Sequence, residues 1–154
     1  MAEPPFDLAR AHRWFGVEFN NRAWELVEKE GRSAVEVEEM LHAAHAAAIH
    51  WQQVGAPING QRAEVLLATA YAAVGRWDTA LRHAQKALVL SETTAADGSE
   101  HAFDRASTLA IAARAHQALG DALEGERLLA LALRTADALP ADDRIVFDKL
   151  YVRQ

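Results

Sequence analysis

Three glycines divide this sequence at a nearly constant spacing. Gly31, Gly75 and Gly120 lie 44 and 45 residues apart, and each stands between two alanine-rich segments. An alanine follows each glycine twelve residues later, at Ala43, Ala87 and Ala132. A repeat of this length is typical of helical hairpins that cannot bury their apolar faces alone and must stack on one another. The spacing therefore predicts a helical-repeat fold.

Local signals indicate where the helices begin and end. Ser33 and Glu36 match a capping box, in which a serine hydroxyl and a glutamate carboxylate accept hydrogen bonds from free backbone N–H groups at a helix start. The run 55–60 has glycine at both ends and contains a proline, which predicts a joint between helices. We expect helix pairs over residues 6–54, 58–93 and 100–139. A last helix over 142–152 would cover the open end of the stack.

The expected fold class is all-α: a right-handed stack of about three antiparallel helix pairs with a C-terminal capping helix. We assign residues 1–154 to one domain, because a chain of 154 residues with 51% hydrophobic residues can form one compact core. Two details are less regular. Gly16 and the Asn20–Asn21 pair allow a break in the first helix, and the polar run 93–99 predicts a mobile loop or a lid.

Charge and composition limit the expected partners. The formal net charge is −6, and the sequence has no concentrated run of basic residues, so neither nucleic acid nor an anionic membrane is expected as a partner. The chain has no cysteine, which excludes disulfides and thiolate metal sites. Its first residues lack the features of a signal peptide, and no apolar run is long enough to span a bilayer. We therefore expect a cytoplasmic location.

The second repeat resembles a known family. Its landmarks are Leu67, Ala68, Tyr71, Gly75, Trp77, Ala80, Ala84, Ala87 and Leu88, and together they look like a tetratricopeptide repeat. The third repeat has His116 where that family prefers tyrosine. The family period is about 34 residues, so units of 44 and 45 residues predict longer helices or longer joints. The resemblance covers residues 20–139.

The resemblance implies a concave surface, lined by the first helix of each pair, that holds a peptide or another protein. On the family pattern, the second repeat would present four residues to this groove: Arg62, Val65, Thr69 and Ala73. No serine lies in a Gly-x-Ser-x-Gly motif and no phosphate-binding glycine loop is present, so we assign no catalytic residue and no cofactor. The expected function is a non-enzymatic protein-interaction module.

Self-association is a further hypothesis. The first helix has a wide apolar face, and the C-terminal segment carries a second one, formed by Ile145, Val146, Phe147, Leu150 and Tyr151. Both exceed what a monomer needs to bury, which favours a homodimer through a terminal helix.

An alternative function rests on the histidines of residues 38–51. Its candidate metal ligands are Glu38, His42, His45 and His50. On a helix, His42 and His45 lie about 60° apart and Glu38 lies within about 40° of His42, so these side chains can converge on one transition-metal ion. The alternative is a metal- or small-ligand-binding helical protein, with a catalytic role left open. No His-Glu-x-x-His motif is present, and partly exposed histidines that bond to neighbouring helices or water are the favoured interpretation.

The four tryptophans also have two interpretations. Trp14, Trp24, Trp51 and Trp77 stand in predicted helices, where large aromatic side chains ordinarily fill the gaps between helices. An aromatic ligand cage is the alternative. The helical spacing favours core packing.

Overall fold

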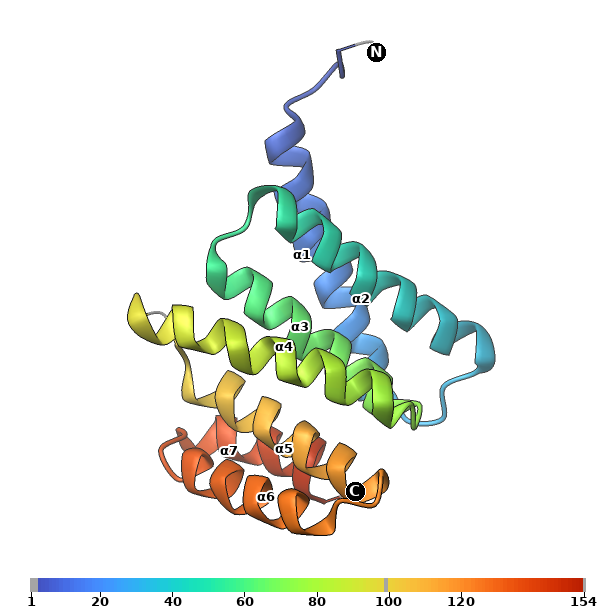
Figure 1. Cartoon of the computed structure of the whole chain (residues 1–154). Coiled ribbons are helices and arrows are strands. Elements are labelled where there is room, and N and C mark those ends of the chain that lie inside the picture. Colours follow the sequence, from blue (N-terminus) through green and yellow to red (C-terminus); the bar gives the residue numbers. More distant parts are fainter. Residues whose placement is uncertain (1–2, 99, 154) are drawn as a thin grey trace.

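The computed structural model describes residues 3–98 and 100–153, and these ranges contain helices and no strand (Figure 1). The helices are α1 (Leu8–Glu28), α2 (Ala34–Val54), α3 (Pro57–Ala73), α4 (Trp77–Ala96), α5 (Ala102–Ala118), α6 (Ala122–Ala136) and α7 (Ala141–Phe147), and a π-helical turn, η1 (Asp148–Val152), continues α7. The pairs α1–α2, α3–α4 and α5–α6 each pack along their length. The predicted all-α class with three helix pairs and a C-terminal helix is confirmed.

The turn within each pair depends on a glycine. Gly31, Gly75 and Gly120 have φ angles of 65°, 72° and 95°, a conformation that glycine adopts far more readily than residues with a side chain. After the first turn, the predicted capping box is present: the amide of Glu36 donates to Ser33 Oγ at 3.3 Å, and the amide of Ser33 donates to Glu36 Oε2 at 2.9 Å. The regular glycine spacing in the sequence therefore marks the hairpin turns.

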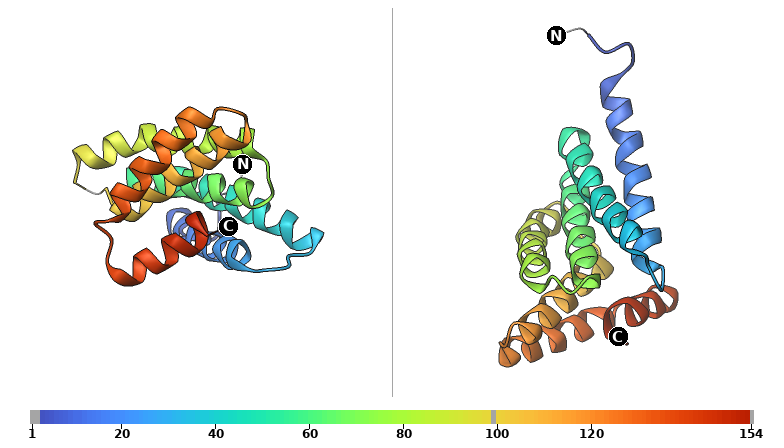
Figure 2. Two further views of the ribbon diagram at one scale, coloured as in Figure 1. Left: turned by 90° about the horizontal axis from the view of Figure 1, so that it is seen from below. Right: turned by 90° about the vertical axis from the view of Figure 1, so that its right-hand side faces the viewer.

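The helices stack with the first member of each pair on one side. In Figure 1, α2, α4 and α6 lie in front of α1, α3 and α5. Helix α3 contacts both α1 and α5, and the C-terminal helix α7 with η1 contacts α5. Figure 2 shows that this C-terminal segment returns on the side of α1. The side formed by α1, α3 and α5 is thus partly enclosed by the end of the chain.

Alanine-rich faces bring neighbouring helices close together. Nine alanines of α3, α4 and α5 are completely buried: Ala68, Ala70, Ala80, Ala84, Ala87, Ala106, Ala110, Ala113 and Ala115. Small side chains at a helix contact allow a short distance between the helix axes. Larger residues such as Leu66 and Leu109 fill the space beside these contacts.

Helix α1 is continuous, so neither Gly16 nor the Asn20–Asn21 pair breaks it. Gly16 is buried against the indole of Trp51 on α2, and a Cβ at this glycine would lie 2.9 Å from Trp51 Cε2. The close approach of α1 and α2 at this position explains why it is occupied by glycine. The amino-terminal end of α1 projects past the other helices (Figure 2).

The polar run predicted as a mobile loop is mostly helical. Helix α4 continues to Ala96 and therefore includes residues 93–96. Thr94 is fully buried, and its hydroxyl donates to Oε1 of Gln61 on α3. This buried hydrogen bond fixes the end of α4 on α3, so the loop prediction was wrong for these residues. Ser99 lies outside the described residues.

The apolar face of the C-terminal segment is mostly used within the chain. Phe147, Leu150 and Tyr151 are buried in the same core cluster as α5, whereas Ile145 and Val146 are 66% and 42% exposed. A dimer through this segment would therefore have only its outer residues available. The exposed apolar residues of α1 and the chain before it include Phe6, Leu8, Trp14 and Val17. Self-association stays a prediction.

Gly125 tests how closely α5 and α6 pack. A Cβ at this position would lie 2.4 Å from Cγ of Gln117 and 2.9 Å from the carbonyl oxygen of Ala113. We expect Gly125→Ala to lower the free energy of unfolding by about 1–3 kcal/mol, because backbone atoms must move to admit the methyl group. Urea unfolding followed by circular dichroism measures the change.

Gly60→Ala is the matched control. Gly60 lies within α3, and a Cβ there would meet no atom within 4 Å. Alanine favours a helix over glycine, so we expect no loss, or a gain of up to about 1 kcal/mol. Equal losses in the two variants would contradict the close-packing explanation.

Candidate functional site

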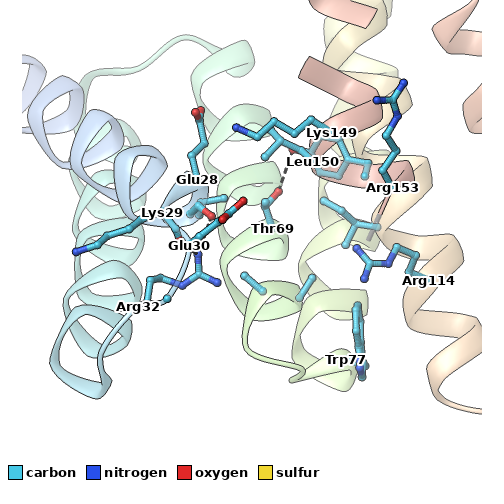
Figure 3. A pocket seen from close by; sticks show the side chains of 16 residues that line it. Glu28, Lys29, Glu30, Arg32, Thr69, Trp77, Arg114, Lys149, Leu150 and Arg153 are labelled. Atoms are coloured by element: carbon cyan, nitrogen blue, oxygen red, sulfur yellow. Dashed lines mark hydrogen bonds between the residues drawn. The ribbon is translucent and has the colours of Figure 1, made fainter. Parts of the chain in front are cut away.

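A pocket of about 510 Å³ lies between α1, α3, α5 and the C-terminal segment (Figure 3). One wall consists of residues 27–32, at the end of α1 and the turn after it. The opposite wall contains Arg114 of α5 and residues of the C-terminal segment, among them Lys149 and Arg153. Between the walls, α3 lines the floor of the pocket with Thr69, Ala72 and Ala73, Ile111 of α5 adds to the lining, and Trp77 lies at one end.

Tyr151 attaches the C-terminal segment to the floor of this pocket. Its side chain is buried, and its hydroxyl lies 3.3 Å from Oγ1 of Thr69. The Thr69 hydroxyl donates to the carbonyl of Val65 at 2.8 Å, so the Tyr151 hydroxyl is the donor to Thr69. Burial raises the pKa of Tyr151 to about 12, which keeps the hydroxyl protonated for this bond. The contact holds Lys149 and Arg153 beside the pocket.

Arg114 places a positive charge on the same wall. Its guanidinium carbon lies 5.2 Å from the centroid of the Trp77 ring, within the range of a cation–π interaction. Burial lowers the pKa of Arg114, but a guanidinium remains charged in proteins. Figure 3 shows Arg114 and Lys149 reaching into the gap from this wall.

The wall formed by α1 and its turn has a different character. Arg32 donates three hydrogen bonds of 2.7 to 2.9 Å to backbone carbonyls at the end of α1. Lys29 forms an ion pair with Glu36 and points away from the gap in Figure 3. Glu28 and Glu30 are exposed on this wall. Arg32 and Lys29 thus support the turn, whereas the carboxylates of Glu28 and Glu30 can face a ligand.

The four predicted groove residues have different environments. Thr69 and Ala73 line the pocket. Val65 is 3% exposed, so it presents no surface to a partner. Arg62 donates to Oδ2 of Asp104 at 2.9 Å and thereby links α3 to α5. Partner binding at Thr69 and Ala73 stays a prediction.

The structure does not bring together the predicted metal ligands Glu38, His42, His45 and His50. His50 faces α1, where its Nδ1 lies 2.8 Å from Nδ1 of His12. His45 faces α3, where its Nε2 lies 2.8 Å from the Tyr71 hydroxyl. The imidazoles of His45 and His50 point in different directions, because a separation of five residues corresponds to about 140° around a helix. Glu38 and His42 are exposed. Over residues 3–98 and 100–153, no three histidine, aspartate or glutamate side chains are placed to hold a metal ion.

A different histidine arrangement connects α2, α3 and α4. Nδ1 of His83 lies 2.6 Å from Oε2 of Glu64, and the His83 ring stacks on Tyr71 with 5.6 Å between centroids. Burial raises the pKa of Glu64, but the hydrogen bond and charge of His83 and the charge of Lys86 outweigh it, so the pKa lies below its ordinary value. Nε2 of His83 is buried and has no hydrogen-bond partner among the described residues. These contacts join α3 to α4, and His45 of α2 reaches the same cluster through its hydrogen bond to Tyr71 and its ring contact with His83.

The tryptophans do not form a cage. Trp24 and Trp51 pack against the core, as the helical spacing predicts, whereas Trp14 is 58% exposed and Trp77 lines the pocket.

Sequence reasoning missed the basic wall of the pocket. Arg114, Lys149 and Arg153 come from two separate segments and match no motif. A sequence signal for a basic site is a run of basic residues along the chain, whereas these three residues meet because the C-terminal segment returns over α5. No local signal could have found them.

Comparisons with protein-family models, with curated proteins and with solved structures find no match for this chain. In the part of the chain that the structure describes, none of the helices combines the length and apolarity needed to cross a bilayer.

Acid sensitivity tests the environment of His50. Burial and the neighbouring His12 lower the pKa of His50. A histidine whose pKa is lowered by folding binds protons more readily in the unfolded chain, so stability is complete above about pH 6.5 and decreases as the pH falls through the folded-state pKa. We expect the melting temperature to fall between pH 7 and pH 5, and to fall less in His50→Phe, whose ring can still stack on Phe15 and Phe19.

His42→Gln is the control, because His42 is exposed on the same helix. Its melting temperature should follow the wild-type dependence on pH. If His50→Phe also follows the wild-type curve, protonation of His50 does not destabilise the fold.

Proposed function

We propose that this protein is a tetratricopeptide-like interaction module that binds a polypeptide segment in the pocket between α1, α3, α5 and the C-terminal segment. The observation that carries the proposal is the position of this pocket. It lies on the side formed by the first helices of the pairs, which is the side that the resemblance assigns to partner binding. Two residues expected there from the sequence, Thr69 and Ala73, contribute to its floor.

The size and lining of the pocket support a binding role. A volume of about 510 Å³ is within the range of protein ligand sites. Small floor residues such as Ala72 and Ala73 leave room for the main chain of a bound segment. The hydroxyls of Thr69 and Tyr151 are buried and engaged with each other, which favours a supporting role for them over a nucleophilic one.

A steric block tests this proposal. Peptides are selected from a random displayed library with the full chain as bait, and their dissociation constants are measured by fluorescence anisotropy. Ala73 is exposed and lines the pocket, so Ala73→Trp should fill the gap without changing any charge. We expect affinity to fall about tenfold or more, a loss of at least about 1.4 kcal/mol of binding free energy.

Ala130→Trp is the matched control, since Ala130 is exposed on α6 and does not line the pocket. It should bind the selected peptides as the wild type does, and both variants should show wild-type circular dichroism and melting. Failure to select any peptide, or equal binding by the two tryptophan variants, would argue against a polypeptide-binding pocket.

A further inference from the structure

The pocket has the opposite charge balance to the protein as a whole. The chain has 16 lysines and arginines against 22 aspartates and glutamates. The residues that line the pocket include five basic side chains, Lys29, Arg32, Arg114, Lys149 and Arg153, and two acidic ones, Glu28 and Glu30. A cleft lined by one sign of charge concentrates the field and favours ligands of opposite sign. Basic side chains therefore outnumber acidic ones in the lining of this pocket, although the protein as a whole is acidic.

The two walls differ in the charge that they offer. Among the described residues, the wall of α5 and the C-terminal segment contributes Arg114, Lys149 and Arg153 to the pocket lining and no acidic side chain. On the facing wall, both basic residues are engaged in the fold, and Glu28 and Glu30 make no ion pair among the described residues. A bound chain therefore meets positive charge on one side and negative charge on the other.

Arg114 contributes a positive charge with little freedom to move. The Trp77 ring beneath its guanidinium restricts the side chain, and partial burial reduces the screening of its charge by water. Lys149 and Arg153 are exposed beside it, where they can bind carboxylates of a bound segment. A guanidinium such as that of Arg153 binds a carboxylate through two parallel hydrogen bonds, which adds geometric selectivity to the attraction.

A nucleic acid fits this arrangement less well. Its phosphates require an extended basic surface, whereas here the basic wall spans one pocket and the chain carries a formal charge of −6. The floor, where Ala72 and Ala73 are small and accessible, suits the main chain of a peptide.

We infer that the pocket binds an acidic polypeptide segment. Its carboxylates bind Lys149 and Arg153 on the wall that also carries the charge of Arg114, and they lie away from Glu28 and Glu30 on the facing wall. This inference rests on the proposed function, since it names the chemistry of the partner for the same pocket. The carboxylates at positions 28 and 30 act as a selectivity element, because they repel an acidic segment that approaches the wrong wall.

Charge reversal tests the inference. The probes are peptides selected from the random library by the wild-type chain, together with copies in which every Asp and Glu is replaced by Asn and Gln. We expect the selected set to be enriched in Asp and Glu. The selected acidic peptides should bind the double variant Lys149→Glu/Arg153→Glu about tenfold or more weakly than they bind the wild type. Their binding to the wild type should weaken between low and high salt.

Arg82→Glu/Arg134→Glu is the control of equal charge change, since both arginines are exposed and lie outside the pocket lining. It should bind within about twofold of the wild type. A second variant, Glu28→Gln/Glu30→Gln, removes the repelling carboxylates and should tighten the acidic peptides by about threefold.

The outcomes separate this inference from the proposed function. Selected peptides that lack an acidic excess, or that bind the Lys149→Glu/Arg153→Glu variant as they bind the wild type, would overturn the acidic partner and leave the groove as a polypeptide site. A nucleic acid that bound the wild type more tightly than the acidic peptides would also overturn it. The complete absence of selected peptides would overturn the proposed function itself.

Discussion

The close approach of helices through alanine faces is the constraint on which the structure depends. Ala80 and Ala84 on α4 and Ala106 and Ala110 on α5 are completely buried, so the second and third pairs meet with little side-chain volume between them. A small side chain contributes little apolar area of its own, so the stabilisation comes from the many atoms that the short distance brings into contact. Gly16 and Gly125 extend the same principle to the pairs α1–α2 and α5–α6.

The C-terminal segment connects this packing to the pocket. Phe147 and Tyr151 are buried with α5, and the Tyr151 hydroxyl bonds to Thr69 on α3. The exposed Lys149 and Arg153 are thereby held at the edge of the pocket. The basic wall of the pocket therefore depends on the packing of the C-terminal segment on α5 and α3.

The local elements could be predicted from the sequence because their causes are local. The positive φ of Gly75 and the capping box at Ser33 each depend on a few adjacent residues. The end of α4 could not be predicted, because Thr94 is helical owing to a hydrogen bond with Gln61, 33 residues away. The histidines of α2 were equally hard to interpret from the sequence. Helical spacing gives the angle between His45 and His50, but their hydrogen-bond partners come from α1 and α3, which are distant in the sequence.

The sequence by itself determined the all-α class, the three helix pairs and the position of each hairpin turn, since glycine spacing, capping residues and apolar periodicity act within a few residues of one another. Only the tertiary structure decided what the surfaces offer. It buried Val65, left Ala73 exposed, separated the histidines, and gathered Arg114, Lys149 and Arg153 on one wall. A binding surface is formed by residues that are close in space, and in this chain that closeness arises when the C-terminal segment packs on α5 and α3.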